Sequence, residues 1–336
     1  MLRGGNLLGG VEFGSLTSSI FCFFKVVFRF LGYCFKFSWC VQSERLKYFK
    51  VICLKLGNCF KEVKKMVTKK EKLYEDLLRL RVVSFDDIVE RARSIIDAAP
   101  RRGYIYRKYV RRLVDEGRLL RVRKGLYLVL SLLETPEDHV ADKLLIASKV
   151  RDEYYLGFHT ALEYYGCAHS LYNQAYVCVK RVDRFDPFQY GRFSFNPVFV
   201  DDTDIEVEDK QYQGHILRVS SKERTFLDCL DRVQYAGGWE ECLKSLEGLG
   251  DLNFQKLVNL LLKREKEILF RRAGYVLELL KNQSPFYEHL NDHLLNRIAE
   301  TVSETPRYMV DGEKGRLNDR WNLYVPDDFE EMLRGI

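Results

Sequence analysis

The 336-residue sequence lacks the motifs of several large protein classes. It has no Walker-type phosphate-binding loop and no glycine-rich dinucleotide fingerprint. It also lacks an uninterrupted apolar run, because Lys25, Arg29 and Lys36 divide the stretch 20–39. A charged side chain at the centre of a bilayer costs about 3 kcal/mol. No stable membrane span is therefore expected.

Metal and disulfide frameworks are missing as well. The pairs Cys34/Cys40 and Cys53/Cys59 are spaced too widely for a zinc knuckle, in which paired ligands lie about 2–4 residues apart. The remaining cysteines of the 9 are scattered, which is atypical of a secreted disulfide scaffold. We expect a cytoplasmic protein with no bound metal and no cofactor.

The net charge is only +6, but it is distributed unevenly along the chain. Residues 1–66 hold 11 basic and 3 acidic residues, and residues 67–134 hold 17 and 10. Residues 135–336 hold 26 basic and 35 acidic residues, a net charge of −9. The early part of the chain thus suits an anionic partner. The later part suits a basic protein partner or dimerisation, or carries ordinary surface charge that maintains solubility.

The leader, residues 1–66, differs in composition from the rest and contains 10 of the 22 Phe. Two interpretations remain open. The segment is a basic amphipathic helix that lies on a membrane surface, as in an adaptor protein. Alternatively, it is an upstream extension, and translation begins at Met66. It is not a typical secretory signal, because no small-residue cleavage site follows the apolar run.

Residues 67–134 have the pattern of three helices followed by a hairpin. Apolar spacing predicts a first helix around 73–80, a second from Ser84 to Ala99, and a third from Tyr104 to Glu116. Ser84 and Asp87 form a capping-box-like start to the second helix. Two β-type runs within 119–129, joined at 123–125, predict a hairpin. This is the layout of a winged helix-turn-helix domain.

The third helix and the hairpin concentrate positive charge, with 10 basic and 2 acidic residues over 101–124. Arginine side chains on an exposed helix can contact guanine edges in the major groove, and a basic wing can neutralise phosphates. A solvated basic helix face is the alternative. The candidate DNA-binding residues are Arg107, Lys108, Arg111 and Arg112 on the helix, and Arg121, Arg123 and Lys124 on the wing.

Residues 135–336 mix helical and strand patterns, which favours a larger α+β domain. Helices are expected over 138–150, 220–232, 237–246, 252–263 and 268–280, and a strand end that enters a helix over 155–166, with the helix stopping at Gly166. Antiparallel-looking strands are expected over 175–180, 192–195, 198–200 and 215–219. Ser220 and Glu223 predict a capping box, and Arg224 and Asp228 predict an i,i+4 ion pair. The whole chain is expected to be α+β, with a winged helix-turn-helix domain first.

Five short motifs follow one another along the chain: Lys124–Tyr127, Thr160–Leu162 with Gly166, Glu223–Asp228, Gly237-Gly238 and Arg271–Tyr275. In this order they resemble the motifs of the AbiEi-type antitoxins and related regulators of viral-defence toxin–antitoxin systems. The resemblance covers about residues 67–280. The leader has no counterpart, and the tail after Lys281 matches only loosely.

The resemblance implies a DNA-binding transcriptional regulator whose first domain represses its own operon. Its C-terminal domain would counter a nucleotidyltransferase-like toxin. Many relatives are regulators without a toxin, so a stand-alone regulator is the alternative. The expected partners are double-stranded operator DNA, a cognate toxin of that type, and a second copy of the chain on DNA.

Enzymatic alternatives have weaker support in the sequence. Glu208 and Lys210, within the acidic run 201–210, fit the acid-x-Lys element of a metal-dependent nuclease, but a solvated acidic loop is favoured. His289 and His293 lie four residues apart without an evident third ligand. The remaining candidate pair, Cys167 and His169, would rarely face each other productively at this spacing. No catalytic residue is therefore expected.

Overall fold

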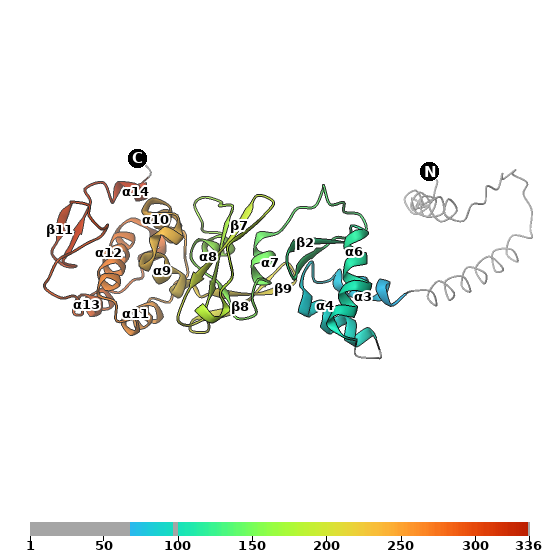
Figure 1. Cartoon of the computed structure of the whole chain (residues 1–336). Helices are drawn as coiled ribbons and strands as arrows, with labels where there is room; N and C mark the ends of the chain where they lie inside the picture. The colour runs from blue at the N-terminus through green and yellow to red at the C-terminus, as the bar shows by residue number, and fades with distance from the viewer. Residues whose placement is uncertain (1–67, 97–99, 335–336) are drawn as a thin grey trace, which may run out of the picture. The chain divides into compact units, whose positions relative to one another are not determined.

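Helices and three separate sheets make up the part of the chain that the computed structural model describes, residues 68–96 and 100–334 (Figure 1). The fold class is therefore α+β, as the sequence predicted. The leader, with both interpretations placed on it, lies outside the described residues. None of the helices within those residues is long and apolar enough to cross a membrane.

The first part of the described chain contains helices and a small sheet. Its elements are α3 (Lys69–Leu77), β1 (Val82–Ser84), α4 (Phe85–Ile95), α5 (Arg102–Ile105), η1 (Tyr106–Val110), α6 (Arg111–Asp115), β2 (Leu119–Arg123) and β3 (Leu126–Val129). The strands lie in the order β1-β3-β2, and both pairings are antiparallel. The three helical regions and the hairpin were predicted. Strand β1 was not, because three residues are too few to show a strand period.

Helix α4 begins at the predicted capping box. The hydroxyl of Ser84 accepts a hydrogen bond from the backbone N–H of Asp87 at 3.0 Å, and the Asp87 carboxylate accepts one from the Ser84 N–H at 2.9 Å. The helix ends at Ile95, short of the predicted Ala99, which lies outside the described residues. The cap therefore satisfies two backbone donors that the helix itself cannot.

We expect Ser84→Ala to lower the free energy of unfolding by about 0.5–2 kcal/mol, because it removes the acceptor for the Asp87 N–H. Urea titration monitored by circular dichroism measures this change. Ser94→Ala on the same helix is the control, since the Ser94 hydroxyl only donates to the carbonyl of Arg91. An equal loss in both variants would contradict a specific role for the cap.

Strand β3 is buried on both of its faces. Tyr127 and Val129 pack with the helices of the first part of the chain. Leu126 and Leu128 point to the opposite face, where they share a core with Leu145 of α7 and with the strands of the second sheet. This alternation follows the two-residue period of a strand. The small sheet thus contributes to two hydrophobic cores at once.

The second sheet has six strands and is mixed rather than antiparallel. Its elements and their neighbours are α7 (Lys143–Ser148), β4 (Tyr155–Leu156), α8 (Phe158–Tyr165), β5 (Gln174–Val179), η2 (Arg181–Asp183), β6 (Phe188–Tyr190), β7 (Phe193–Phe199), β8 (Val207–Tyr212) and β9 (His215–Ser220). The strand order is β6-β7-β5-β4-β9-β8. Strands β5 and β7 are parallel, as are β4 and β9. Strand direction depends on pairings between distant segments, which local patterns do not contain.

Several expected boundaries in this region were wrong. The helix expected over 138–150 begins only at Lys143, because the Asp142 side chain caps it by accepting from the N–H of Leu145 at 3.0 Å. The strands expected over 192–195 and 198–200 form one strand, β7, which continues through Pro197. The strand end and helix expected over 155–166 are β4 and α8, and the helix stops as expected at Gly166, in the left-handed conformation that glycine favours.

The last part of the chain is mainly helical. Its elements are α9 (Lys222–Asp231), η3 (Val233–Ala236), α10 (Trp239–Glu247), α11 (Phe254–Lys263), α12 (Glu267–Gln283), η4 (Pro285–Tyr287), α13 (Asp292–Ala299), β10 (Arg307–Tyr308), β11 (Arg316–Asn318), β12 (Leu323–Val325) and α14 (Glu331–Arg334). The strands form a third sheet in the order β10-β12-β11. The helices expected over 237–246, 252–263 and 268–280 correspond to α10, α11 and α12.

Helix α12 holds the C-terminal segment through a buried arginine. The side chain of Arg271 is 0% exposed and donates hydrogen bonds to the backbone carbonyls of Ser303 and Thr305, both at 2.9 Å. Trp321, also fully buried, packs over Gly274 of the same helix. The motif Arg271–Tyr275 therefore lies within α12, where its arginine and glycine bind the tail.

Candidate functional site

The basic helix expected over 104–116 is a continuous helical segment formed by α5, η1 and α6, from Arg102 to Asp115. Its apolar side is buried in the core of the first part of the chain, through Ile105, Tyr109, Val110 and Leu113. The basic side chains predicted to face away from that core do so, and all four are exposed: Arg107, Lys108, Arg111 and Arg112. The segment thus has one apolar and one cationic side, as predicted.

Two of these four cations have weak partners and two have none among the described residues. Lys108 donates to the hydroxyl of Tyr104 at 2.7 Å. Arg111 lies 3.9 Å from Asp115, and both side chains are about two-thirds exposed, so this pair contributes little to stability. Arg107 and Arg112, both exposed, make no side-chain hydrogen bond or ion pair with another described residue. The folded chain therefore leaves these donors available to an external anion.

The middle of this segment has π-helical hydrogen bonding over Tyr106–Val110. The backbone N–H of Arg111 donates to the carbonyl of Tyr106, five residues earlier. Such turns are rare, and they frequently occur at functional sites within α-helices. No local sequence signal predicted this turn, and it lies directly before the pair Arg111 and Arg112.

The hairpin places its three predicted cations in different surroundings. Arg121 and Lys124 are exposed, and Lys124 lies in the two-residue turn with Gly125, whose φ is +83°. Arg123 is instead half-buried, with its guanidinium 4.7 Å from the ring centroid of Phe188. Burial lowers the pKa of Arg123 from its ordinary value. A β-bulge lies between Arg121, which is exposed, and Arg123, which is half-buried.

The acidic run 201–210 is not a solvated loop throughout. Residues from Val207 onward form β8, an edge strand paired with β9. Glu208 lies 2.5 Å from Lys210, and Lys256 of α11 lies 2.5 Å from Glu206 and 3.2 Å from Glu223. Within the described residues, no group of three or more potential metal ligands is close enough together to hold an ion. Glu206 and Glu208 are instead paired with lysines.

The other candidate pairs are not brought together as a site. His293 lies in the first turn of α13, whereas His289 precedes the helix, so the two do not share a helical face. Burial raises the pKa of the Cys167 thiol to about 11, the opposite of what a nucleophile requires. The backbone N–H of His169 donates to Ser245 at 2.9 Å.

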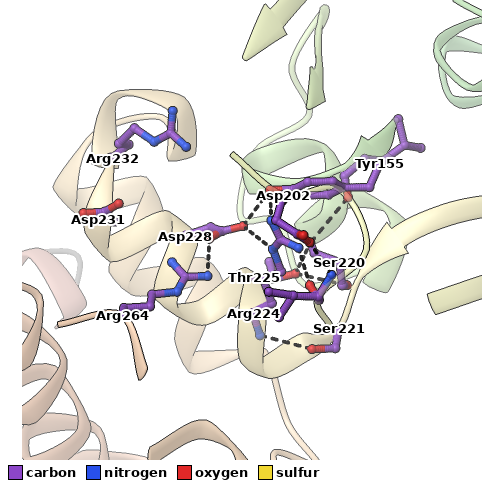
Figure 2. A network of polar contacts seen from close by, with 12 residues as sticks. Tyr155, Asp202, Ser220, Ser221, Arg224, Thr225, Asp228, Asp231, Arg232 and Arg264 are labelled. Carbon is purple, nitrogen blue, oxygen red and sulfur yellow. Dashed lines mark hydrogen bonds and ion pairs between the residues drawn. The ribbon is translucent and has the colours of Figure 1, made fainter. Parts of the chain in front are cut away.

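A buried polar network lies where strand β4 meets helix α9 (Figure 2). The predicted i,i+4 pair is present, with Nε of Arg224 3.4 Å from Oδ2 of Asp228. Arg224 also donates to the hydroxyl of Tyr155 at 2.8 Å, and that hydroxyl donates to Asp228 at 3.3 Å. The other Asp228 oxygen accepts from Arg264 at 2.6 Å. One carboxylate therefore serves two guanidinium groups.

The start of α9 differs from the expected capping box. Ser221, not Ser220, caps the helix and accepts from the N–H of Arg224 at 3.2 Å. Ser220 ends strand β9, and its hydroxyl bonds that of Thr225 at 2.7 Å. Glu223 accepts instead from the N–H of Asn253 at 3.0 Å. The expected box was wrong because two consecutive serines offered two possible registers.

No family model and no curated protein matches the sequence. Among solved structures, the crystal structure of the RV2827C protein from Mycobacterium tuberculosis is similar in fold, with a TM-score of 0.55. The match covers 80% of this chain and 95% of that one, at 14% sequence identity. At this identity the likeness concerns the fold alone.

Proposed function

We propose that the chain is a DNA-binding transcriptional regulator and that residues 67–134 act as a winged helix-turn-helix domain. The observation that carries the proposal is the cationic side of the segment 102–115, whose opposite side is buried. Arg107, Lys108, Arg111 and Arg112 would enter the major groove. Arg121 and Lys124 would contact phosphates from the hairpin.

Arg123 has a different role in this proposal. Because its guanidinium is half-buried against Phe188, it would set the direction of the hairpin rather than extend to a phosphate. The exposed wing contacts are thus reduced to Arg121 and Lys124.

The resemblance to AbiEi-type antitoxins supports a more specific version of the proposal. The protein would repress its own operon in the cytoplasm, as a homodimer on the operator, and would counter a nucleotidyltransferase-like toxin. A stand-alone regulator is the alternative. A nucleotidyltransferase-like gene next to this one, whose toxicity is relieved by co-expression of the chain, would favour the antitoxin.

The combined variant Arg111→Ala and Arg112→Ala tests the DNA-binding surface. Each well-placed arginine–guanine contact contributes about 1–3 kcal/mol, so we expect at least about 30-fold weaker binding to DNA from the region upstream of the gene. Fluorescence anisotropy at several salt concentrations measures the affinity. The salt dependence should also become less steep, because fewer counterions are released.

The matched control removes two cations elsewhere, through Lys314→Ala and Arg316→Ala. Both side chains are exposed and lie in the C-terminal part of the chain. This control should bind DNA as the unmodified protein does. Unchanged binding by the Arg111/Arg112 variant, or equal weakening in the control, would refute the proposed surface.

A further inference from the structure

A second candidate binding site lies beside the buried network of Tyr155, Arg224, Asp228 and Arg264. A cavity of about 490 Å³ opens between the carboxyl end of β7 and helices α9 and α11. It is lined by both aromatic and charged side chains. They include Tyr155, Phe199, Asp228, Arg232, Lys263 and Arg264.

The inner wall of this cavity carries more positive than negative charge. Asp228 is 5% exposed and is the only carboxylate within hydrogen-bond distance of both Arg224 and Arg264 among the described residues. Burial raises the pKa of Tyr155 well above its ordinary value, so this hydroxyl stays neutral. Two guanidinium groups thus share one ion-paired carboxylate, and Asp202 adds only a longer-range attraction to Arg224.

The two arginines beside Asp228 differ in how many hydrogen bonds their side chains make. Arg224 donates to Tyr155 and to the backbone carbonyls of Asp202 and Ile205. Arg264 makes one hydrogen bond, to Asp228, and its side chain is 18% exposed. Its remaining N–H donors are available at the cavity. Arg224 thus positions Asp228, and Asp228 in turn holds Arg264.

The mouth of the cavity adds two more cations. Lys263 is exposed and has no partner among the described residues. Arg232 donates to the carbonyl of Phe199 at 3.0 Å, and its guanidinium lies 5.1 Å from the ring centroid of Phe158. Neither has a carboxylate within ion-pair distance in the described chain. Five cations thus line the cavity against four carboxylates, within a region, 135–336, whose net charge is −9.

Three further acids line the cavity, and two of them have partners of their own. The Asp202 carboxylate accepts from the backbone N–H groups of Asp204 and Ile205 at 2.7 and 2.6 Å. These hydrogen bonds lower the pKa of Asp202. Asp231 pairs with Lys266 at 2.7 Å, and Asp201 is exposed. None of them neutralises Arg232, Lys263 or Arg264 directly.

We propose that this cavity binds a small molecule that carries a phosphate group. The planar fork of Arg264 matches a phosphate, and Lys263 adds a point charge at the entrance. The ring of Phe199 is 38% exposed beside these cations and offers an apolar surface to the organic part of the ligand. A mononucleotide fits this combination better than free phosphate does. This proposal goes beyond DNA binding and does not depend on it.

Calorimetric titration of the full chain tests the proposal, with adenosine monophosphate, inorganic phosphate and adenosine as separate probes. We expect the monophosphate to bind at roughly millimolar concentration or below, more tightly than inorganic phosphate, and adenosine to bind much more weakly. Lys263→Glu should weaken binding of the monophosphate by about 10-fold or more, since it reverses a charge at the entrance. Lys263→Gln is the milder second variant.

Lys314→Glu is the matched control, because it reverses an exposed lysine far along the chain, in the C-terminal segment. It should bind the monophosphate as the unmodified protein does. Three results would each overturn the proposal: no binding of either phosphate-bearing probe, adenosine binding as tightly as its monophosphate, or equal weakening by Lys263→Glu and Lys314→Glu. Equal binding of inorganic phosphate and the monophosphate would support a phosphate site but would contradict the preference for a mononucleotide.

Discussion

Replacement of Asp228 by alanine is expected to lower the free energy of unfolding by about 3–5 kcal/mol. The carboxylate is 5% exposed and is the shared partner of Arg224 and Arg264. Its removal leaves the buried Arg224 guanidinium without its ion-pair partner and deprives the Tyr155 hydroxyl of its acceptor. Breaking a buried ion pair from one side is costly because the remaining charge cannot regain water.

The control for this variant is Asp231→Ala, one helical turn further along α9. Asp231 also pairs with a basic residue and is itself only 12% exposed, but its partner Lys266 is 55% exposed and stays in water when the pair is broken. The loss there should be about 1 kcal/mol, because no buried charge is left without a partner. Urea titrations of both variants compare the two sites. Losses of equal size would show that burial does not distinguish them.

Gly274→Ala is expected to destabilise the protein by about 1–3 kcal/mol, against the usual trend for helices. In the interior of an exposed helix, the same change would stabilise the helix by about 1 kcal/mol. Here a Cβ atom would overlap the indole ring of Trp321, which is fully buried and has no room to move aside. Thermal and urea unfolding should both show the loss.

Gly103→Ala provides the opposite case within the same chain. Gly103 lies in α5, and a Cβ placed there meets no atom within 4 Å. This variant should be neutral or slightly stabilised. The sign of the difference between the two alanine variants is therefore the decisive observation. A stabilising Gly274→Ala would contradict the close packing of α12 against Trp321.

Local patterns predicted much of the first part of the chain. The apolar positions of the segment 102–115 and the capping box at Ser84 depend on neighbours within one or two turns, so a sequence contains them directly. The exposure of Arg107, Lys108, Arg111 and Arg112 follows from the same periodicity. The surroundings of Arg123 could not be predicted, because Phe188 lies 65 residues further along the chain.

The buried network shows the same division between local and distant information. The pairing of Arg224 with Asp228 was predicted from its i,i+4 spacing. Its other members are Tyr155, from strand β4, and Arg264, from the end of helix α11. Only the fold brings them to Asp228. The cavity beside them was invisible in the sequence for the same reason, since no contiguous motif lines it.

The burial of strand β3 on both faces has a consequence for how the chain can be divided. If the chain were cut after the hairpin, Leu126 and Leu128 would lose the partners that cover them and would face water. A fragment ending near residue 134 would then carry an apolar surface that favours self-association. The cationic helix and hairpin are therefore best studied as part of the longer chain.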